Sequence, residues 1–187
     1  MELSILKLGS YLQMNITIRK LTPDDAEQYR GCRLDALLNA PSAFASSYEE
    51  EETSTKEMLR ERFREMMDSG ENAFIGAFDG ELLIGLTGIA REDRQKRNHK
   101  MIIFSVFVRP EYQGKKVGSQ LIEAAISHAR KVEGIERIEL SVESNNAPAK
   151  ALYQSFGFTT WGTEPQFSKI DGVYYDEDYM TLKLLAH

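Results

Sequence analysis

The chain has 187 residues, of which 42% are hydrophobic and 28% charged, a composition that fits one globular domain and excludes a disordered chain. Its single cysteine, Cys32, excludes a disulfide framework and a multi-cysteine metal centre, and the three histidines have no ligand spacing, so we expect no metal. The net charge of −6 argues against a nucleic-acid partner, and no run of 18 apolar residues is present to span a membrane.

The first residues, MELSILKLGSYLQM, mix apolar and polar side chains and contain a Gly9-Ser10 break. They lack the charged start, the long apolar stretch and the small-residue cleavage site of a secretory signal. We therefore expect a cytoplasmic protein, with residues 1–13 as a loosely attached leader and a single domain over residues 14–187.

The next part of the chain predicts one strand followed by two helices. Residues 15–20 alternate apolar and polar side chains, as a short strand does. A helix to about Asn39 starts at Thr22 and Pro23, which suit an N-cap and a first helical position. Its expected inward residues are Tyr29, Cys32, Leu34, Leu37 and Leu38. A second helix over 54–68 is expected to face inward with Met58, Leu59, Phe63, Met66 and Met67.

Between these helices, residues 42–53 are expected to be irregular. They carry four consecutive acids, Glu49 to Glu52. This acidic run is either a solvated approach to the next helix or a rim that attracts a cationic substrate.

Three strands are expected to follow. Residues 73–79 and 82–90 are apolar runs joined by Asp79-Gly80, which is a hairpin turn signal. The polar, mostly basic segment 91–100 predicts another hairpin connection. Residues 101–109 form the most apolar stretch and predict a central strand that is buried on both faces.

The second half continues the alternation of strands and helices. A turn over 110–118 leads into a helix to about Val132, and residues 135–142 predict a strand. The remaining elements are expected to be a helix from Asn146 to about Phe156, a strand over 158–161, a long polar loop over 162–176 and a final strand over 179–185. This order predicts one α/β domain in which helices pack on a mixed sheet.

A strand–turn–helix segment over residues 106–120 carries the functional signal. The first amides of a helix have no partner inside the helix and lie at its positive end, so they can bind phosphate oxygens. Gly114 and Gly118 would let a diphosphate approach the backbone closely, while Lys115 and Lys116 add positive charge. The same glycines would also serve simple strand-to-helix packing, so the turn alone leaves both interpretations open.

Two sequence blocks resemble the GCN5-related N-acetyltransferase (GNAT) superfamily. Residues 113–118, Gln-Gly-Lys-Lys-Val-Gly, are similar to the acetyl-CoA loop of that family, Gln/Arg-x-x-Gly-x-Gly/Ala, and depart from it at Lys116, where glycine is usual. The second block runs from Asn146 through Ala149, Leu152 and Tyr153 to Gly157-Phe158, in the order of another family motif. The resemblance implies a central mixed, mostly antiparallel sheet flanked by helices.

The resemblance also implies an enzyme that transfers the acetyl group of acetyl-CoA to a primary amine by direct attack. The amine would belong to a small molecule, a protein N-terminus or a lysine. Family position assigns the cofactor contacts to the backbone of Val106, Phe107 and Val108 and to the phosphate-loop residues Gln113, Gly114, Lys115, Lys116, Val117, Gly118 and Ser119. Asn146 is either a contact to the pantetheine arm or the N-cap of its helix.

Two residues are expected to be catalytic. Tyr153 lies at the acid position of the family, where a phenol can give a proton to the CoA thiolate; its alternative role is a packed aromatic. For the base, Glu139, Ser141 and Glu143 alternate along one strand face, and some relatives have a glutamate at the position of Ser141. We assign the base to Glu143, with a solvated carboxylate as the alternative.

The sequence says less about the acceptor amine and about whether the fold serves catalysis or only ligand binding. Acidic residues near the expected acceptor entrance, over 49–52 and at Asp171, Asp176, Glu177 and Asp178, favour a cationic amine. Two other functions use the same loop: a non-catalytic acetyl-CoA sensor, which Lys116 and Ser141 favour, and a nucleotide-binding regulator. Family habit further implies a homodimer formed through a sheet edge.

Overall fold

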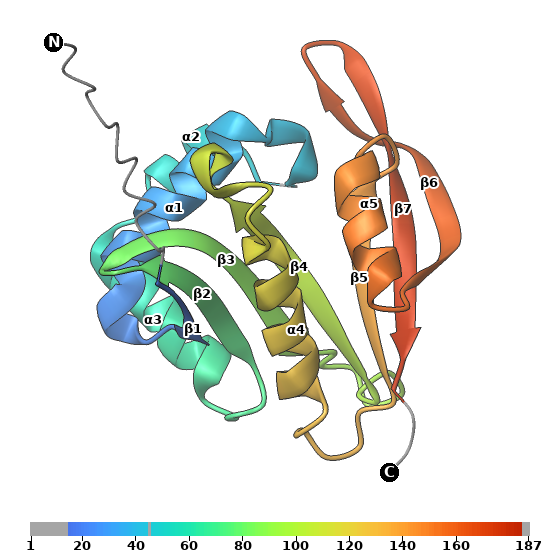
Figure 1. Cartoon of the computed structure of the whole chain (residues 1–187), viewed down its shortest axis with the longest axis horizontal. Coiled ribbons are helices and arrows are strands. Elements are labelled where there is room, and N and C mark those ends of the chain that lie inside the picture. The colour runs from blue at the N-terminus through green and yellow to red at the C-terminus, as the bar shows by residue number, and fades with distance from the viewer. Residues whose placement is uncertain (1–14, 45, 185–187) are drawn as a thin grey trace, which may run out of the picture.

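The protein is built on a seven-stranded sheet with the strand order β1-β2-β3-β4-β5-β7-β6 (Figure 1). The computed structural model describes residues 15–44 and 46–184, and the predicted leader over residues 1–13 lies outside them. The strands are β1 (Ile16–Lys20), β2 (Ala73–Asp79), β3 (Leu82–Arg91), β4 (Lys100–Val108), β5 (Arg137–Glu143), β6 (Thr159–Ile170) and β7 (Val173–Lys183).

Five α-helices are described, together with short 3-10 turns at Pro23–Asp25, Pro41–Ala43 and Pro110–Tyr112. The helices are α1 (Ala26–Asn39), α2 (Tyr48–Glu52), α3 (Lys56–Met67), α4 (Val117–Ala129) and α5 (Ala147–Ser155). Within the described ranges, none has the length and apolarity needed to cross a membrane. Neighbouring strands are antiparallel except β4 and β5, which run parallel. These elements confirm the predicted mixed, mostly antiparallel sheet flanked by helices.

Helices cover both faces of the sheet. On one face α1 and α3 bury an aromatic cluster of Tyr29, Phe63 and Phe74, whose ring centroids are 4.7 to 5.0 Å apart. On the other face α4 packs its apolar side, including Leu121, against residues such as Ile75. Phe74 and Ile75 are neighbours in β2 and point to opposite faces, because side chains alternate along a strand. The central strands are therefore buried between two helical layers.

The central strand β4 is buried on both faces only in part. Ile103 lies in the α4 cluster and Phe107 in the α1–α3 cluster, as expected for the apolar stretch 101–109. Between them, Ser105 and Val106 are only partly buried. The reason is that this part of the strand borders a cavity.

Two residues that were expected to face the core are exposed. Leu38 in α1 is 62% exposed and Met58 in α3 is 59% exposed. In each helix the buried stripe passes through an adjacent residue, Leu37 or Leu59, and successive residues are about 100° apart around the axis. Phe63 follows Leu59 by four residues, so these two side chains share the buried face of α3, and Met58 points to solvent.

The irregular segment expected over 42–53 is wrong in part, because its last residues form α2. The Ser47 hydroxyl accepts a hydrogen bond from the Glu50 amide at 3.2 Å, and the Glu50 carboxylate accepts one from the Ser47 amide at 2.8 Å. This reciprocal pair is a capping box, and its Ser-x-x-Glu spacing is visible in the sequence.

The polar loop expected over 162–176 is wrong. These residues belong to the long β6–β7 hairpin, which turns at Asp171 and Gly172 with φ values of +49° and +83°. Two consecutive positive φ values are typical of a tight hairpin turn, for which Asp-Gly is a preferred sequence. Pro165 and Gln166 lie at a register shift within β6 and interrupt the alternation that marks a strand.

Phe63→Ala is expected to lower the free energy of unfolding by about 3–5 kcal/mol, because it removes a fully buried ring between Tyr29 and Phe74 and leaves a cavity. Met58→Ala removes an exposed side chain of the same helix and should change this free energy by less than about 0.5 kcal/mol. Urea unfolding followed by circular dichroism measures both variants. Equal losses would contradict the packing of α3 described above.

Candidate active site

The sheet opens between its two parallel strands. β4 and β5 pair only along Lys100–Ile102 and Arg137–Glu139 and then diverge (Figure 1). A cavity of about 640 Å³ lies in the opening. This volume is within the range of sites that bind small molecules and cofactors.

A bulge turns β4 away from β5. Ser105 has a φ of +54°, and the pairing register between β3 and β4 shifts between Leu86 and Gly88. One extra residue of β4 therefore lies opposite Thr87, whose hydroxyl donates to the Phe104 carbonyl at 3.2 Å. Bulges increase local twist and redirect side chains, so this one re-aims Ser105 and opens the sheet.

The β4 edge from Val106 to Val108 forms one wall of the cavity. The Phe107 side chain is buried under α1 and α3, while Val106 and Val108 pack beside the α4 cluster. Beyond Ile102, no described strand pairs with the edge that faces β5. The side chains of this segment thus serve the core, while its backbone can pair with an extended ligand in the manner of an added strand.

The turn after β4 brings the start of α4 to the cavity, which Gln113 and Gly118 line. The first hydrogen bond of the helix runs from the Gln120 amide to the Lys116 carbonyl at 3.1 Å. The amides of Val117, Gly118 and Ser119 precede this bond and lie at the positive end of the helix dipole. This end of α4 is therefore suited to bind an anion such as a diphosphate.

Lys116 departs from the family pattern in its side chain, while its own backbone has a conformation that suits glycine. It is the N-cap of α4 and has φ +63° and ψ +13°, the left-handed conformation that favours glycine. The glycine that is usual at this position is thus explained by the backbone. The Lys116 side chain is exposed, so it adds positive charge beside the start of the helix.

The other loop residues have separate structural roles. The Gln113 side-chain amide donates to the Val108 carbonyl at 3.0 Å and ties the loop to the end of β4. An added Cβ at Gly114, where φ is +72°, would meet no described atom within 4 Å, whereas one at Gly118 would lie 3.3 Å from Leu152. Gly118 therefore serves close packing of α4 against α5, and the open space is at Gly114.

Helix α5 brings the second sequence block to the same cavity, which Asn146 and Tyr153 line. The Asn146 side chain accepts a hydrogen bond from the Ala149 amide at 3.1 Å, so it is the N-cap of α5. Tyr153 is 5% exposed and its ring meets Phe158 edge to face. Burial, with a smaller contribution from Glu177, raises the pKa of Tyr153 above its usual value, and the phenol stays protonated at neutral pH.

Two carboxylates lie opposite each other on the far wall of the cavity. Glu143 in β5 and Glu177 in β7 are direct cross-strand neighbours, and both line the cavity together with Ser141. Glu177 is 8% exposed, and burial, followed by the nearby carboxylates Glu143 and Asp178, raises its pKa above its usual value; a hydrogen bond from Ser141 partly opposes this shift. The sequence predicted Glu177 only as one of the acids near the acceptor entrance, because only the β5–β7 register places it beside Glu143.

The third alternating residue of β5, Glu139, has a different environment. Its carboxylate accepts a hydrogen bond from Lys100 at 2.6 Å and forms an ion pair with it. Both residues lie where β4 and β5 are still paired. The Glu139–Lys100 pair therefore links β4 and β5 at the end where the two strands are still paired. Of the three residues that alternate along β5, Ser141 and Glu143 line the cavity.

Several of the acidic residues expected to attract a cation are engaged inside the protein. Glu51 forms ion pairs with Arg33 at 3.7 Å and with Arg62 at 3.4 Å. Asp178 binds Lys150 at 2.5 Å, which lowers the pKa of this aspartate to about 2. These acids therefore stabilise the walls of the site by ion pairing. Arg33 also lines the cavity, although its position on the first helix carries no signal for this in the sequence.

A model of the Acetyltransferase (GNAT) family matches residues 34–158, and the chain belongs to this family. Its curated relatives include a mycothiol acetyltransferase of Brachybacterium faecium, 29% identical over 80% of this chain and 44% of the relative. They also include N-alpha-acetyltransferase RimI of Mycobacterium tuberculosis, 31% identical over 59% of this chain and 66% of the relative. The chain spans about half the length of the mycothiol acetyltransferases that it matches.

Solved structures of this family have the same fold. An acetyltransferase of the GNAT family from Streptococcus pneumoniae superposes with a TM-score of 0.80 and 24% identity over 90% of this chain and 99% of that chain. YncA, a putative acetyltransferase from Salmonella typhimurium with its cofactor acetyl-CoA, has a TM-score of 0.80 and 24% identity over 92% of this chain and 96% of that chain.

Lys116→Gly is expected to raise the free energy of unfolding by up to about 1 kcal/mol. The left-handed backbone costs a non-glycine residue about 1–2 kcal/mol, and the substitution removes this cost. The larger conformational entropy of glycine in the unfolded chain offsets only part of the gain. Lys115→Gly is the matched control. Lys115 is not in the left-handed region, so its replacement should lower the free energy of unfolding by about 0.4–1 kcal/mol. Chemical denaturation of both variants tests this, and equal losses would contradict it.

Proposed function

We propose that the protein transfers the acetyl group of acetyl-CoA to a primary amine. The observation that carries this proposal is the opening between β4 and β5. It combines a strand edge at Val106–Val108, the start of α4 and the side chains of Tyr153 and Glu177 around one cavity. These parts correspond to the needs of the reaction: a place for an extended cofactor, a place for its phosphates, a proton donor and a proton acceptor.

The residues present fit acetyl-CoA as the cosubstrate. The amides of Val117, Gly118 and Ser119, with the positive charges beside them, would hold the diphosphate. The backbone edge of Val106–Val108 would hold the pantetheine arm as an added strand. Asn146 lies on the same path while it caps α5. When bound, acetyl-CoA supplies an activated thioester.

An ammonium acceptor first releases one proton to solvent; the neutral amine then attacks, and its nitrogen must lose one further proton as the carbon–nitrogen bond forms. We assign the proton acceptor to the cross-strand carboxylates Glu143 and Glu177, and of these Glu177 is the more deeply buried. Its raised pKa makes it a stronger base than an ordinary carboxylate.

Tyr153 completes the proton balance. A carbon–nitrogen bond forms and the carbon–sulfur bond breaks, the nitrogen loses its proton to the carboxylate, and the leaving sulfur takes the phenolic proton of Tyr153. The buried phenol remains protonated until it is needed, which is the state required of a proton donor. Exchange with solvent then returns one proton to the phenol and removes one from the carboxylate.

The named relatives support an amine as the acceptor. RimI of Mycobacterium tuberculosis is an N-alpha-acetyltransferase, and AaaT of Escherichia coli, 31% identical over 59% of this chain, is an L-amino acid N-acetyltransferase.

Thermal unfolding with acetyl-CoA, CoA and ATP tests the cofactor. At 100 times its dissociation constant, a ligand should stabilise the protein by about 2.7 kcal/mol. Stabilisation by ATP alone would favour a nucleotide-binding regulator. Thiol release with a panel of amines then separates an enzyme from a sensor: binding of acetyl-CoA without release above the hydrolysis background would overturn the proposed activity.

Tyr153→Phe is expected to reduce kcat at least about 100-fold while the affinity for acetyl-CoA changes little, because only the proton donor is removed. Thiol-release kinetics and calorimetry with CoA measure the two effects. Unchanged turnover would remove Tyr153 from the mechanism. Phe156→Leu, on the neighbouring turn and partly buried, serves as a control for altered packing.

Glu177→Gln is expected to reduce kcat/KM about 10²- to 10⁴-fold, because the amide cannot accept the proton. The same variant should raise the melting temperature at pH 7–8. The folded state raises the pKa of Glu177, so stability is lost as the pH rises from the unfolded pKa of this carboxyl through its folded pKa. The neutral amide avoids this cost. Glu143→Gln is the matched comparison: a larger loss of activity in that variant would assign the base to Glu143.

A further inference from the structure

The helix α1 delivers a buried charge to the cavity that the reaction described above does not use. Arg33 is 6% exposed and lines the cavity. Its guanidinium carbon lies 4.5 Å from the centre of the Phe44 ring, which holds the side chain in place by a cation–π contact. A buried guanidinium is costly unless its donors are satisfied.

The donors of Arg33 are poorly satisfied by the protein. Its Nε is buried and has no hydrogen-bond partner among the described residues, and the nearest Glu51 oxygen is 3.7 Å away. Its two terminal nitrogens reach Ser105 and Ser46 only at 3.4 Å each. By contrast, Arg19 in the same protein binds Asp25 through two hydrogen bonds of 2.8 and 2.7 Å. Arg33 therefore retains capacity for a bidentate anion.

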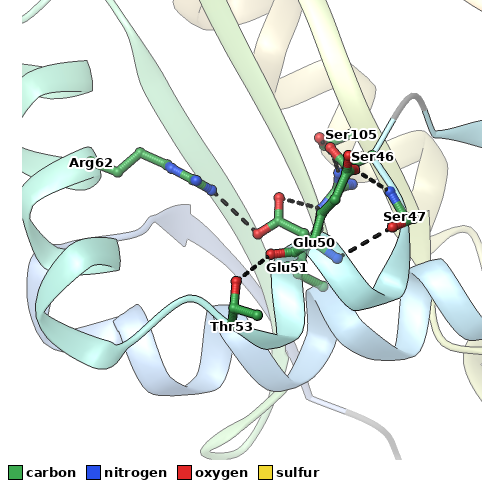
Figure 2. A network of polar contacts seen from close by, with 8 residues as sticks. Ser46, Ser47, Glu50, Glu51, Thr53, Arg62 and Ser105 are labelled. Carbon is green, nitrogen blue, oxygen red and sulfur yellow. Dashed lines mark hydrogen bonds and ion pairs between the residues drawn. The ribbon is translucent and has the colours of Figure 1, made fainter.

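The charge of Arg33 is also only partly compensated by its carboxylate partner, Glu51. Glu51 is shared with a second guanidinium, that of Arg62, at 3.4 Å. Figure 2 shows Arg62 reaching the Glu51 carboxylate from one side of the cluster, while Ser46 and Ser105 lie together at the other. Among the described lining residues of the cavity, Arg33 is the one that carries a positive charge.

The opposite wall carries the opposite sign. Glu143 and Glu177 line it from β5 and β7. A polyamine would place one of its positive charges against Arg33, whereas a molecule with one ammonium and one carboxylate would match both walls. The bulge at Ser105 lies on the β4 wall and contacts Arg33 directly.

We propose that Arg33 binds the carboxylate of the acceptor, and that the acceptor is therefore a small amino acid rather than a polyamine or a simple amine. This inference rests on the proposed acetyl transfer and identifies its substrate class. It replaces the expectation of a purely cationic acceptor. Arg33 is a binding residue here, and the carboxylate accepts two hydrogen bonds from its guanidinium.

The test compares the proteinogenic L-amino acids with their carboxamides in the thiol-release assay. A carboxamide keeps the size and the α-amine but loses the charge, and its amine loses a proton more readily. The best amino acid should nevertheless exceed its amide in kcat/KM by about 10- to 100-fold, as expected for a charged hydrogen-bond pair. Equal or better use of the amide by the wild-type protein would overturn the proposal, whatever the variants do.

Arg33→Gln should raise the KM for the amino acid by about 10- to 100-fold, leave the KM for acetyl-CoA unchanged and abolish the preference for acid over amide. Arg33→Lys keeps the charge without the planar fork and should retain part of the preference. The matched control is Arg62→Gln, which removes a charge from the same Glu51 but lies outside the described lining of the cavity, and it should keep the preference. A preference that survives Arg33→Gln would overturn the proposal; if this variant does not fold, Arg33→Lys and the wild-type ratio decide.

A separate measurement distinguishes failure of this inference from failure of the proposed activity. Thermal unfolding in the presence of CoA reads carboxylate binding without turnover. If neither acids nor amides release thiol, acetyl transfer to these amines is overturned. The carboxylate site would still be supported if amino acids stabilise the wild-type protein, amides do not, and the Arg33→Gln variant shows no stabilisation by amino acids. Absence of that stabilisation would overturn the site as well.

Discussion

The site depends on the early end of hydrogen-bonded pairing between β4 and β5. Each of these strands keeps a full partner on its other side: β4 pairs with β3 through the bulge, and all of β5 pairs with β7. The sheet can therefore open without losing its core, but the opening leaves two internal strand edges. Backbone amides and carbonyls buried without partners are costly, so these edges need water or a ligand. The early end of pairing between β4 and β5 therefore leaves a slot inside the packed domain that is lined by unpaired backbone groups.

The walls of the slot come from different layers of the fold and carry opposite charges. Arg33 belongs to a helix on one face of the sheet, whereas Glu177 belongs to the last strand. Neither is neutralised as fully as the Arg19–Asp25 pair, which closes on itself with short hydrogen bonds. Incomplete pairing costs stability in the free protein and leaves interactions available to a bound molecule. The packing of α1 and of the β6–β7 hairpin must therefore stabilise the fold enough to offset this loss of stability.

Two of the four described non-glycine residues with positive φ lie at the same place. Ser105 and Lys116 both have positive φ values, one in the bulge of β4 and the other at the start of α4. Each conformation is unfavourable for these residues by itself and persists because the strand and helix on either side fix it. The first redirects a strand and the second exposes the first amides of a helix. The two strained residues thus form the opening and its anion-binding end.

The sequence by itself determined the features that depend on neighbours a few residues away. The Asp79-Gly80 turn, the helix start near Thr22 and the two motif blocks identified strands, helices and the family, because turn, cap and loop geometries are set locally. It also contained signals that went unused, such as the Asp171-Gly172 turn that makes residues 162–176 a hairpin. Only the tertiary structure decided which side chains meet: Arg33 contacts Ser105, 72 residues away, and the β5–β7 register sets Glu177 beside Glu143 while Lys100 holds Glu139 at the closed end. Such contacts depend on strand order and register, which the periodicity of a single sequence does not encode.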